Sequence, residues 1–195
     1  MLSIFKFSGV WILVFLLGCC SAVAERYLSV AEVQRLCFPS AEKFDGDVIR
    51  FAPKQKKELE KKAGVPVRNA GNQFWVARSG TNLLGVLMVD FVMGKHELID
   101  YAVAIAPDGK ILQVEILEYR ESHGGQIRGT KWRNQFQGKS VSSPFRLNED
   151  IYNISGATIS CRHVTEGVRR VLATYDLFVR PRLVADKLPD AATEP

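Results

Sequence analysis

Hydrophobic residues near the C-terminal end of the chain repeat with the period of an α-helix. Val168, Val171, Leu172 and Tyr175 follow Val164 by four, seven, eight and eleven positions. That spacing places all five side chains on one face of a helix. The pattern predicts a long helix after residue 160 that buries one side against the rest of the protein.

The middle of the chain has the shorter apolar runs that are typical of β-strands. We expect strands over residues 74–77, 83–93, 98–106 and 111–119. A turn over Ser79–Asn82 and the hairpin signal Asp108-Gly109 separate some of them. Four consecutive strands with short connections predict an antiparallel sheet.

Shorter helices are expected on either side of this meander. Ser29 is a good N-cap for a helix over 29–37 that ends before Pro39, and Pro53 opens a charged helix that stops at Gly64. A short strand at 48–51 lies between them, and a short helix is expected at 128–137. The order of elements predicts an α+β fold, an antiparallel β-meander packed with helices in a single domain.

The first 24 residues have the pattern of a targeting segment. They carry one charge, Lys6, then an apolar run over 10–17, and end in Ala22-Val23-Ala24. This pattern is typical of a signal peptide, with a mature start at Glu25. Two alternatives remain: a lipoprotein box over 16–19 that would leave a lipid-anchored Cys19, and an uncleaved anchor. All three interpretations place the remainder in the periplasm or another extracytoplasmic space.

Organisation and composition complete the outline. We expect a helical N-terminal extension over 25–72, the main domain over 73–178 and a polar tail over 179–195. The net charge of +5 is mild and forms no basic stripe, so nucleic acid is not an expected partner. The mature chain keeps Cys37 and Cys161, which could form a disulfide or remain free thiols. The three histidines lack the spacing of metal ligands.

Small residues and hydroxyls come directly before the long helix, in the run Ser155-Gly156-Ala157-Thr158-Ile159-Ser160. The start of a helix presents unpaired N–H groups and a partial positive charge, so a phosphate can be held there. Ordinary helix capping by Ser or Thr would give a similar pattern. Neither a G-x-S-x-G nucleophile elbow nor a nucleotide P-loop is present.

This run resembles the flavinylation motif of the FMN-binding domain family. That family includes one subunit each of the sodium-pumping NADH:quinone oxidoreductases and of the Rnf complexes, together with small secreted flavoproteins. Three further segments fit the same family in the same order: Asp108–Lys110, the glycine-bearing loop 120–125, and Trp132–Lys139. The resemblance covers roughly residues 75–175.

The resemblance implies FMN as the cofactor and Thr158 as its covalent acceptor. In the family, a Mg²⁺-dependent flavin transferase moves FMN from FAD onto this threonine as a phosphoester. Ser160 is the second candidate acceptor. Residues expected to line the cofactor are Ser155, Gly156, Ala157, Ile159 and Ser160 at the phosphate, and Gly124, Gly125 and Trp132 near the ring. Glycines in an ordinary turn and a core tryptophan are the alternatives for the last three.

The function implied is an exported electron-transfer flavoprotein that exchanges electrons with a membrane redox enzyme, a cytochrome or another flavoprotein. No side chain has to act as an acid–base catalyst, because the flavin carries the redox chemistry. The alternative is a secreted accessory or binding module with the same fold and no covalent flavin. Tyr152 favours that alternative, since it stands where the family usually has an aspartate.

Overall fold

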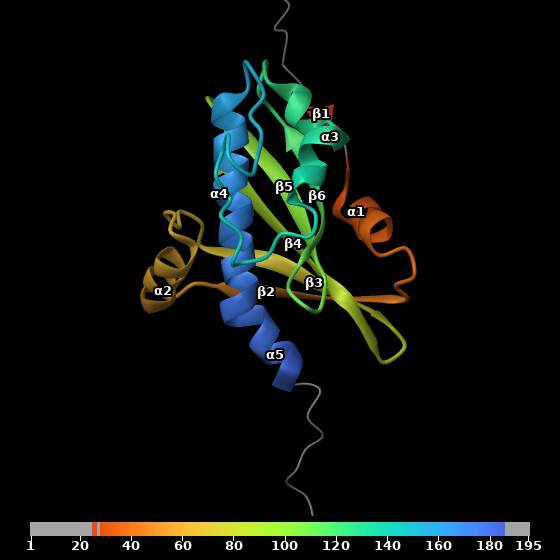
Figure 1. Cartoon of the computed structure of the whole chain (residues 1–195). Helices are drawn as coiled ribbons and strands as arrows, with labels where there is room; N and C mark the ends of the chain where they lie inside the picture. The colour runs from red at the N-terminus through yellow and green to blue at the C-terminus, as the bar shows by residue number, and fades with distance from the viewer. Residues whose placement is uncertain (1–24, 27, 186–195) are drawn as a thin grey trace, which may run out of the picture.

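The computed structural model describes residues 25–26 and 28–185, so the expected signal peptide, Cys19 and residues 186–195 lie outside the described residues. Its centre is a six-stranded antiparallel sheet in the order β1-β6-β5-β4-β3-β2. The strands are β1 (Glu25–Arg26), β2 (Lys43–Arg50), β3 (Gly71–Ser79), β4 (Asn82–Met93), β5 (Leu98–Ile105) and β6 (Ile111–Tyr119). Strands β2 to β6 form a meander. The short first strand, β1, pairs with β6 and forms the edge of the sheet opposite β2 (Figure 1).

The predicted meander is confirmed, and the sheet is wider than the sequence indicated. Strand β2 runs from Lys43 and pairs with residues 71–78 of β3, although we expected a strand only at 48–51. Gly46 and its polar neighbours interrupt the alternation of apolar and polar residues that would indicate a strand. The ring of Trp75 lies over Gly46, where a Cβ would be 2.9 Å from the indole nitrogen. The extension that we expected to be helical therefore supplies β1 and β2 to the sheet.

Helix α4 (Thr158–Thr174) lies across one face of the sheet (Figure 1). The five residues of its predicted stripe are all buried, none more than 2% exposed. Helix α2 (Pro53–Ala63) packs beside α4 and ends at Gly64 in the left-handed conformation, as expected. The same face carries most of the large core side chains, among them Tyr101, Met88 and Phe136.

The segment after α4 is helical rather than a polar tail. A π-helical turn, η3 (Tyr175–Val179), leads into α5 (Arg180–Ala185). Pro181 lies in the first turn of α5, directly after this irregular turn. Val179 and Leu183 are buried in the core. Burial of these two apolar residues explains why the helix continues into residues expected to fray.

Helix α1 (Val30–Cys37) covers part of the opposite face of the sheet (Figure 1). It begins at Ser29 with a capping box to Glu32, which confirms the predicted start. Cys37 packs with the cluster under α1, whereas Cys161 belongs to the core under α4, on the other side of the sheet. Both thiols are free, so the disulfide alternative is wrong.

The helix expected over 128–137 is broken into three short turns. These are η1 (Gly125–Arg128), α3 (Thr130–Arg133) and η2 (Asn134–Phe136). Gly129 has an extended backbone (φ −63°, ψ 133°) that separates η1 from α3, and Gly138 ends the segment with a φ of +76°. These glycines prevent one continuous helix from forming.

Candidate functional site

The start of α4 is open rather than capped. Ala157 is the N-cap and no side chain accepts a hydrogen bond from the first turn. The first intrahelical hydrogen bond runs from the Cys161 N–H to the Ala157 carbonyl at 2.9 Å. The N–H groups of residues 158–160 come before this bond, so the helix itself gives them no acceptor. Gly156 has a φ of +82°, which turns the chain into the helix. Capping by serine or threonine, the alternative explanation of the motif, does not occur here.

The Thr158 hydroxyl stands on the first turn of α4 and is held by one neighbour. The Asn153 amide nitrogen donates a hydrogen bond to Thr158 Oγ1 at 2.9 Å. The Asn153 amide oxygen accepts the Ile154 N–H, also at 2.9 Å, which fixes which end of the amide faces Thr158. Thr158 itself is exposed, so its hydroxyl is both oriented and accessible.

Two nearby residues take other roles. Asp150 forms an ion pair with Lys139 at 2.7 Å and accepts the backbone N–H groups of Phe145 and Arg146. Although burial raises the pKa of Asp150, the Lys139 ammonium and these N–H groups lower it below its usual range. Tyr152 is 71% exposed, and its backbone carbonyl accepts the Trp132 indole N–H. Of these positions, Asn153 is the one that contacts Thr158.

A cleft of about 690 Å³ opens at this end of α4. One side is formed by the backbone and side chains of residues 156–160, and the other by Glu121, Ser122 and His123 after β6 and by Lys95 and His96 between β4 and β5. Four of the predicted phosphate-side residues therefore share a cleft with Thr158; they are Gly156, Ala157, Ile159 and Ser160. Ser155 is exposed beside it.

The two predicted glycine-containing segments meet below the cleft. Gly124 is in the left-handed conformation (φ +85°), and a Cβ there would lie 2.8 Å from the Tyr119 hydroxyl and 3.0 Å from Ala157 Cβ. The Tyr119 hydroxyl donates to the His123 carbonyl and lies 3.3 Å from Ser160 Oγ. Tyr119 and Ser160 are both buried, so this contact joins the loop after β6 to the start of α4.

Glu121 holds together the two segments that form the second side of the cleft. Its Oε1 atom accepts the backbone N–H groups of His96 at 2.5 Å and Glu97 at 3.0 Å. Burial raises the pKa of Glu121, but the N–H groups of Glu97, His96 and Lys95 outweigh it and lower the pKa below its usual range. The ionised carboxylate thus ties the β4–β5 turn to the loop after β6. Sequence reasoning missed Glu121, Lys95 and His96, because only strand pairing brings these two turns together.

Two predicted ring contacts lie elsewhere. Gly125 begins η1 and packs against the Arg128 side chain. Trp132 is 4% exposed, stacks edge-on with Phe136 at 5.1 Å between ring centroids, and donates its N–H to the Tyr152 carbonyl at 2.9 Å. Neither residue lines the cleft, and Gly124, the third residue expected near the ring, does not line it either.

The arrangement suits a phosphate ester with an organic group attached. Uncapped N–H groups and the helix dipole favour a negative charge, an exposed hydroxyl lies on the same helical turn, and the cleft has the volume of a small-molecule site. Within the described residues, no three His, Cys, Asp or Glu side chains gather as a metal site would require. FMN, a phosphate ester of an aromatic ring system, fits these residues.

The fold and this site together define an α+β domain in which an uncapped helix start and an exposed threonine lie at one cleft. Residues 94–173 match the model of the FMN-binding domain family. The chain therefore carries an FMN-binding domain, and FMN is its cofactor. This confirms the resemblance drawn from the sequence.

Two known proteins are similar to the chain. The G subunit of the proton-translocating ferredoxin:NAD(+) oxidoreductase complex of Clostridium ljungdahlii is 25% identical over 117 residues, which are 56% of this chain and 63% of that relative. The crystal structure of Shewanella oneidensis NqrC superposes with a TM-score of 0.55 at 17% identity, covering 77% of this chain and 88% of that one. The second likeness shows that the two share the fold, and confirms the predicted fold class.

No helix within residues 25–26 and 28–185 is long and apolar enough to cross a membrane.

Proposed function

We propose that this protein is an extracytoplasmic electron-transfer flavoprotein that carries FMN as a phosphoester on Thr158. The observation that carries the proposal is the exposed, oriented Thr158 hydroxyl on the first turn of an uncapped helix. Thr158 would hold the phosphate, the N–H groups of residues 158–160 would stabilise its charge, and bound FMN supplies reversible redox chemistry.

Attachment requires a flavin transferase and FAD. Thr158 Oγ1 forms a bond to the FMN phosphorus of FAD, the pyrophosphate P–O bond breaks, AMP leaves, and the hydroxyl proton is released. The Asn153 amide occupies one lone pair of Oγ1 and holds the hydroxyl in one orientation, which leaves another lone pair for the phosphorus. Asn153 would thus orient the hydroxyl of Thr158. Tyr152, which stands where the family usually has an aspartate, makes no such contact with Thr158.

The electron partner we propose is a component of a membrane redox complex. The curated relative belongs to an oxidoreductase complex that translocates protons, and a covalent cofactor cannot be lost outside the cytoplasm. The expected signal peptide, or a lipid anchor at Cys19, would bring the domain to the extracytoplasmic side of the membrane. The alternative is an accessory module without covalent flavin, and the exposed Tyr152 is the observation that favours it.

Co-expression with a flavin transferase tests the proposal through Asn153. Asn153→Ala should slow FMN incorporation severalfold relative to wild type, measured as flavin fluorescence per protein on denaturing gels. Tyr152→Asp should leave incorporation at least as fast. An unlabelled wild type, together with a Tyr152→Asp variant that becomes labelled, would instead mean that Tyr152 blocks attachment and that the accessory-module function is correct.

A further inference from the structure

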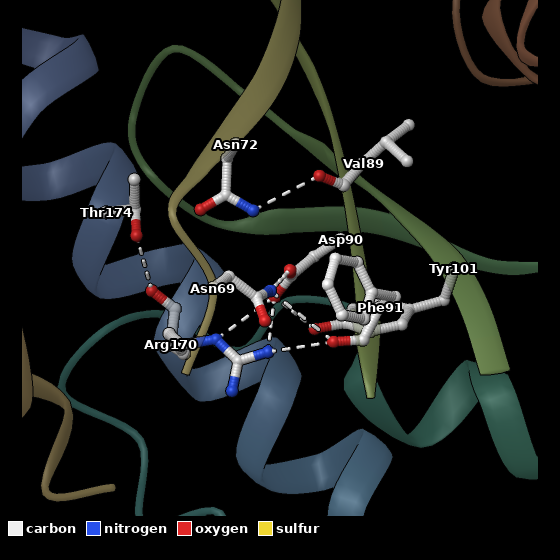
Figure 2. A network of polar contacts seen from close by, with 8 residues as sticks. All are labelled: Asn69, Asn72, Val89, Asp90, Phe91, Tyr101, Arg170 and Thr174. Carbon is white, nitrogen blue, oxygen red and sulfur yellow. Dashed lines mark hydrogen bonds and ion pairs between the residues drawn. The ribbon is translucent and has the colours of Figure 1, made fainter. Parts of the chain in front are cut away.

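Helix α4 is fixed to the sheet by a buried polar network in its second half. Figure 2 shows Arg170 of α4 directed at Asp90 of β4, with Nη2 and Oδ2 2.6 Å apart. The same carboxylate accepts the Tyr101 hydroxyl at 2.9 Å and contacts the Asn69 amide from the segment before β3. Arg170 also donates to the Phe91 carbonyl at 3.2 Å. Because these groups are buried and bonded to one another, the network holds α4 at one place on the sheet.

The first turn of α4 has its own contact with the sheet. Ser160 Oγ lies 3.3 Å from the hydroxyl of Tyr119, the last residue of β6, and both residues are buried. The helix is therefore held near both ends, which fixes the backbone of Thr158. The orientation of the Thr158 hydroxyl then depends on the segment that carries its hydrogen-bond partner, Asn153.

That segment is held by the short turns α3 and η2. The Tyr152 N–H donates to Gln135 Oε1 at 2.6 Å, and the Tyr152 carbonyl accepts the Trp132 indole N–H at 2.9 Å. Gln135 Nε2 also donates to the Trp132 carbonyl at 3.0 Å, so the two residues are bonded to each other. Both backbone polar groups of Tyr152 are thus held from one side. We call Trp132 and Gln135 the Tyr152 clamp.

The two residues before Tyr152 are held as well. Asp150 forms its ion pair with Lys139, which follows the clamp residues by a few positions. Ile151 is fully buried in the core under α4. Asn153 is the next residue along the chain, and its amide nitrogen reaches Thr158 Oγ1 at 2.9 Å. The clamp therefore sets the point from which the Asn153 side chain extends.

The clamp also accounts for a tyrosine at position 152. It uses only the backbone N–H and carbonyl of Tyr152, while the side chain is 71% exposed. Any residue other than proline could be held in the same way, since proline alone lacks the N–H. The side chain at this position is therefore free to differ from the aspartate that is usual in the family.

We infer that Trp132 and Gln135 are positioning residues for flavin attachment: by holding the backbone of Tyr152, they aim the Asn153 amide at the Thr158 hydroxyl. Neither residue touches Thr158, and each acts through Asn153. Trp132, which the sequence led us to expect near the ring, acts on the acceptor instead. This inference rests on the proposed attachment at Thr158.

The kinetics of FMN transfer test the inference, with Gln137 as the matched control. Gln135→Met keeps the length of the side chain and removes its amide, and Gln137→Met makes the same change at an exposed position two residues later. Each mature protein is incubated at several concentrations with a flavin transferase, Mg²⁺ and excess FAD, and FMN incorporation is followed by intact mass. We expect kcat to fall severalfold in Gln135→Met with KM for the protein unchanged, because the hydroxyl's orientation matters in the transfer step. Gln137→Met should behave as wild type.

A double variant separates positioning from a general structural role. Because Gln135 acts through Asn153, adding Gln135→Met to Asn153→Ala should slow transfer no further than Asn153→Ala alone. Effects that multiply in the double variant would show that Gln135 acts independently of Asn153 and would overturn the inference. A wild-type kcat in Gln135→Met would overturn it too.

Amide hydrogen exchange in the wild type gives a test that needs no variant. The Tyr152 N–H should exchange slowly although its side chain is exposed, because Gln135 accepts it. Exchange at the rate of an unprotected amide would refute the clamp while leaving FMN attachment at Thr158 intact. A wild type that takes up no FMN, from a transferase that labels a control protein, would instead refute the proposed attachment and the positioning role with it.

Discussion

Replacing Arg170 with methionine removes the cation from the buried network that joins α4 to the sheet. The Arg170 and Asp90 side chains are 8% and 1% exposed, so the substitution leaves a carboxylate buried without its counter-ion. Breaking such a pair costs about 3–5 kcal/mol of unfolding free energy. Since about 1 kcal/mol corresponds to roughly 2–4 °C in a protein of this size, Tm should fall by about 6–20 °C.

Urea denaturation with a matched control decides whether this reasoning is right. Arg182→Met breaks an ion pair with Asp47 whose side chains are more than half exposed (52% and 58%), and should change stability by less than about 1 kcal/mol. Adding Asp90→Asn to Arg170→Met removes the uncompensated charge and keeps an amide for Tyr101, so the double variant should be more stable than Arg170→Met alone. An Arg170→Met variant as stable as the Arg182 control would refute the network's role.

Three further predictions concern single residues. Gly156→Ala should destabilise the protein by about 1–2 kcal/mol in urea, because φ is +82° while no atom lies within 4 Å of the new Cβ; an unchanged midpoint would show that the backbone relaxes. The folded-state pKa of Glu121 lies below the unfolded value, so its stabilisation is present above about pH 4.3 and is lost as pH falls through the folded pKa. Stability should therefore drop less steeply in acid for Glu121→Gln than for wild type, and parallel pH profiles would contradict the contacts to the β4–β5 turn. Burial and then the nearby Glu115 carboxylate raise the pKa of Cys37 to about 12, so iodoacetamide should alkylate it on the order of a thousandfold more slowly at pH 8 than an unperturbed thiol; rapid labelling would show that the partly buried thiol keeps an ordinary pKa.

Sequence patterns predicted the elements whose signals are local. Strand β6 begins and ends where expected, and the apolar stripe of α4 is buried along its length. Gly64 ends α2 because a left-handed residue terminates the helix, which is a property of one residue and its neighbours. Such features depend on periodicity and turn chemistry, which a sequence carries directly.

The parts that could not be predicted depend on pairing between distant segments. Strand β1 has two residues and exists only because Tyr119 and Glu118 lie beside it. The cleft combines the turn at 95–96 with the loop at 121–123. Asn153 becomes a partner of Thr158 only through the turn at 154–157, which brings a side chain five residues earlier back onto the hydroxyl. None of these contacts has a signature in residue spacing.

The central claim is that FMN is bound covalently to Thr158, and the intact mass of the mature protein tests it most directly. Wild type, Thr158→Ala and Ser160→Ala are each co-expressed with a flavin transferase that is shown to be active on a control protein. We predict a gain equal to FMN minus one water in wild type and in Ser160→Ala, and no gain in Thr158→Ala. A gain retained in Thr158→Ala, or no gain in wild type, would contradict the account.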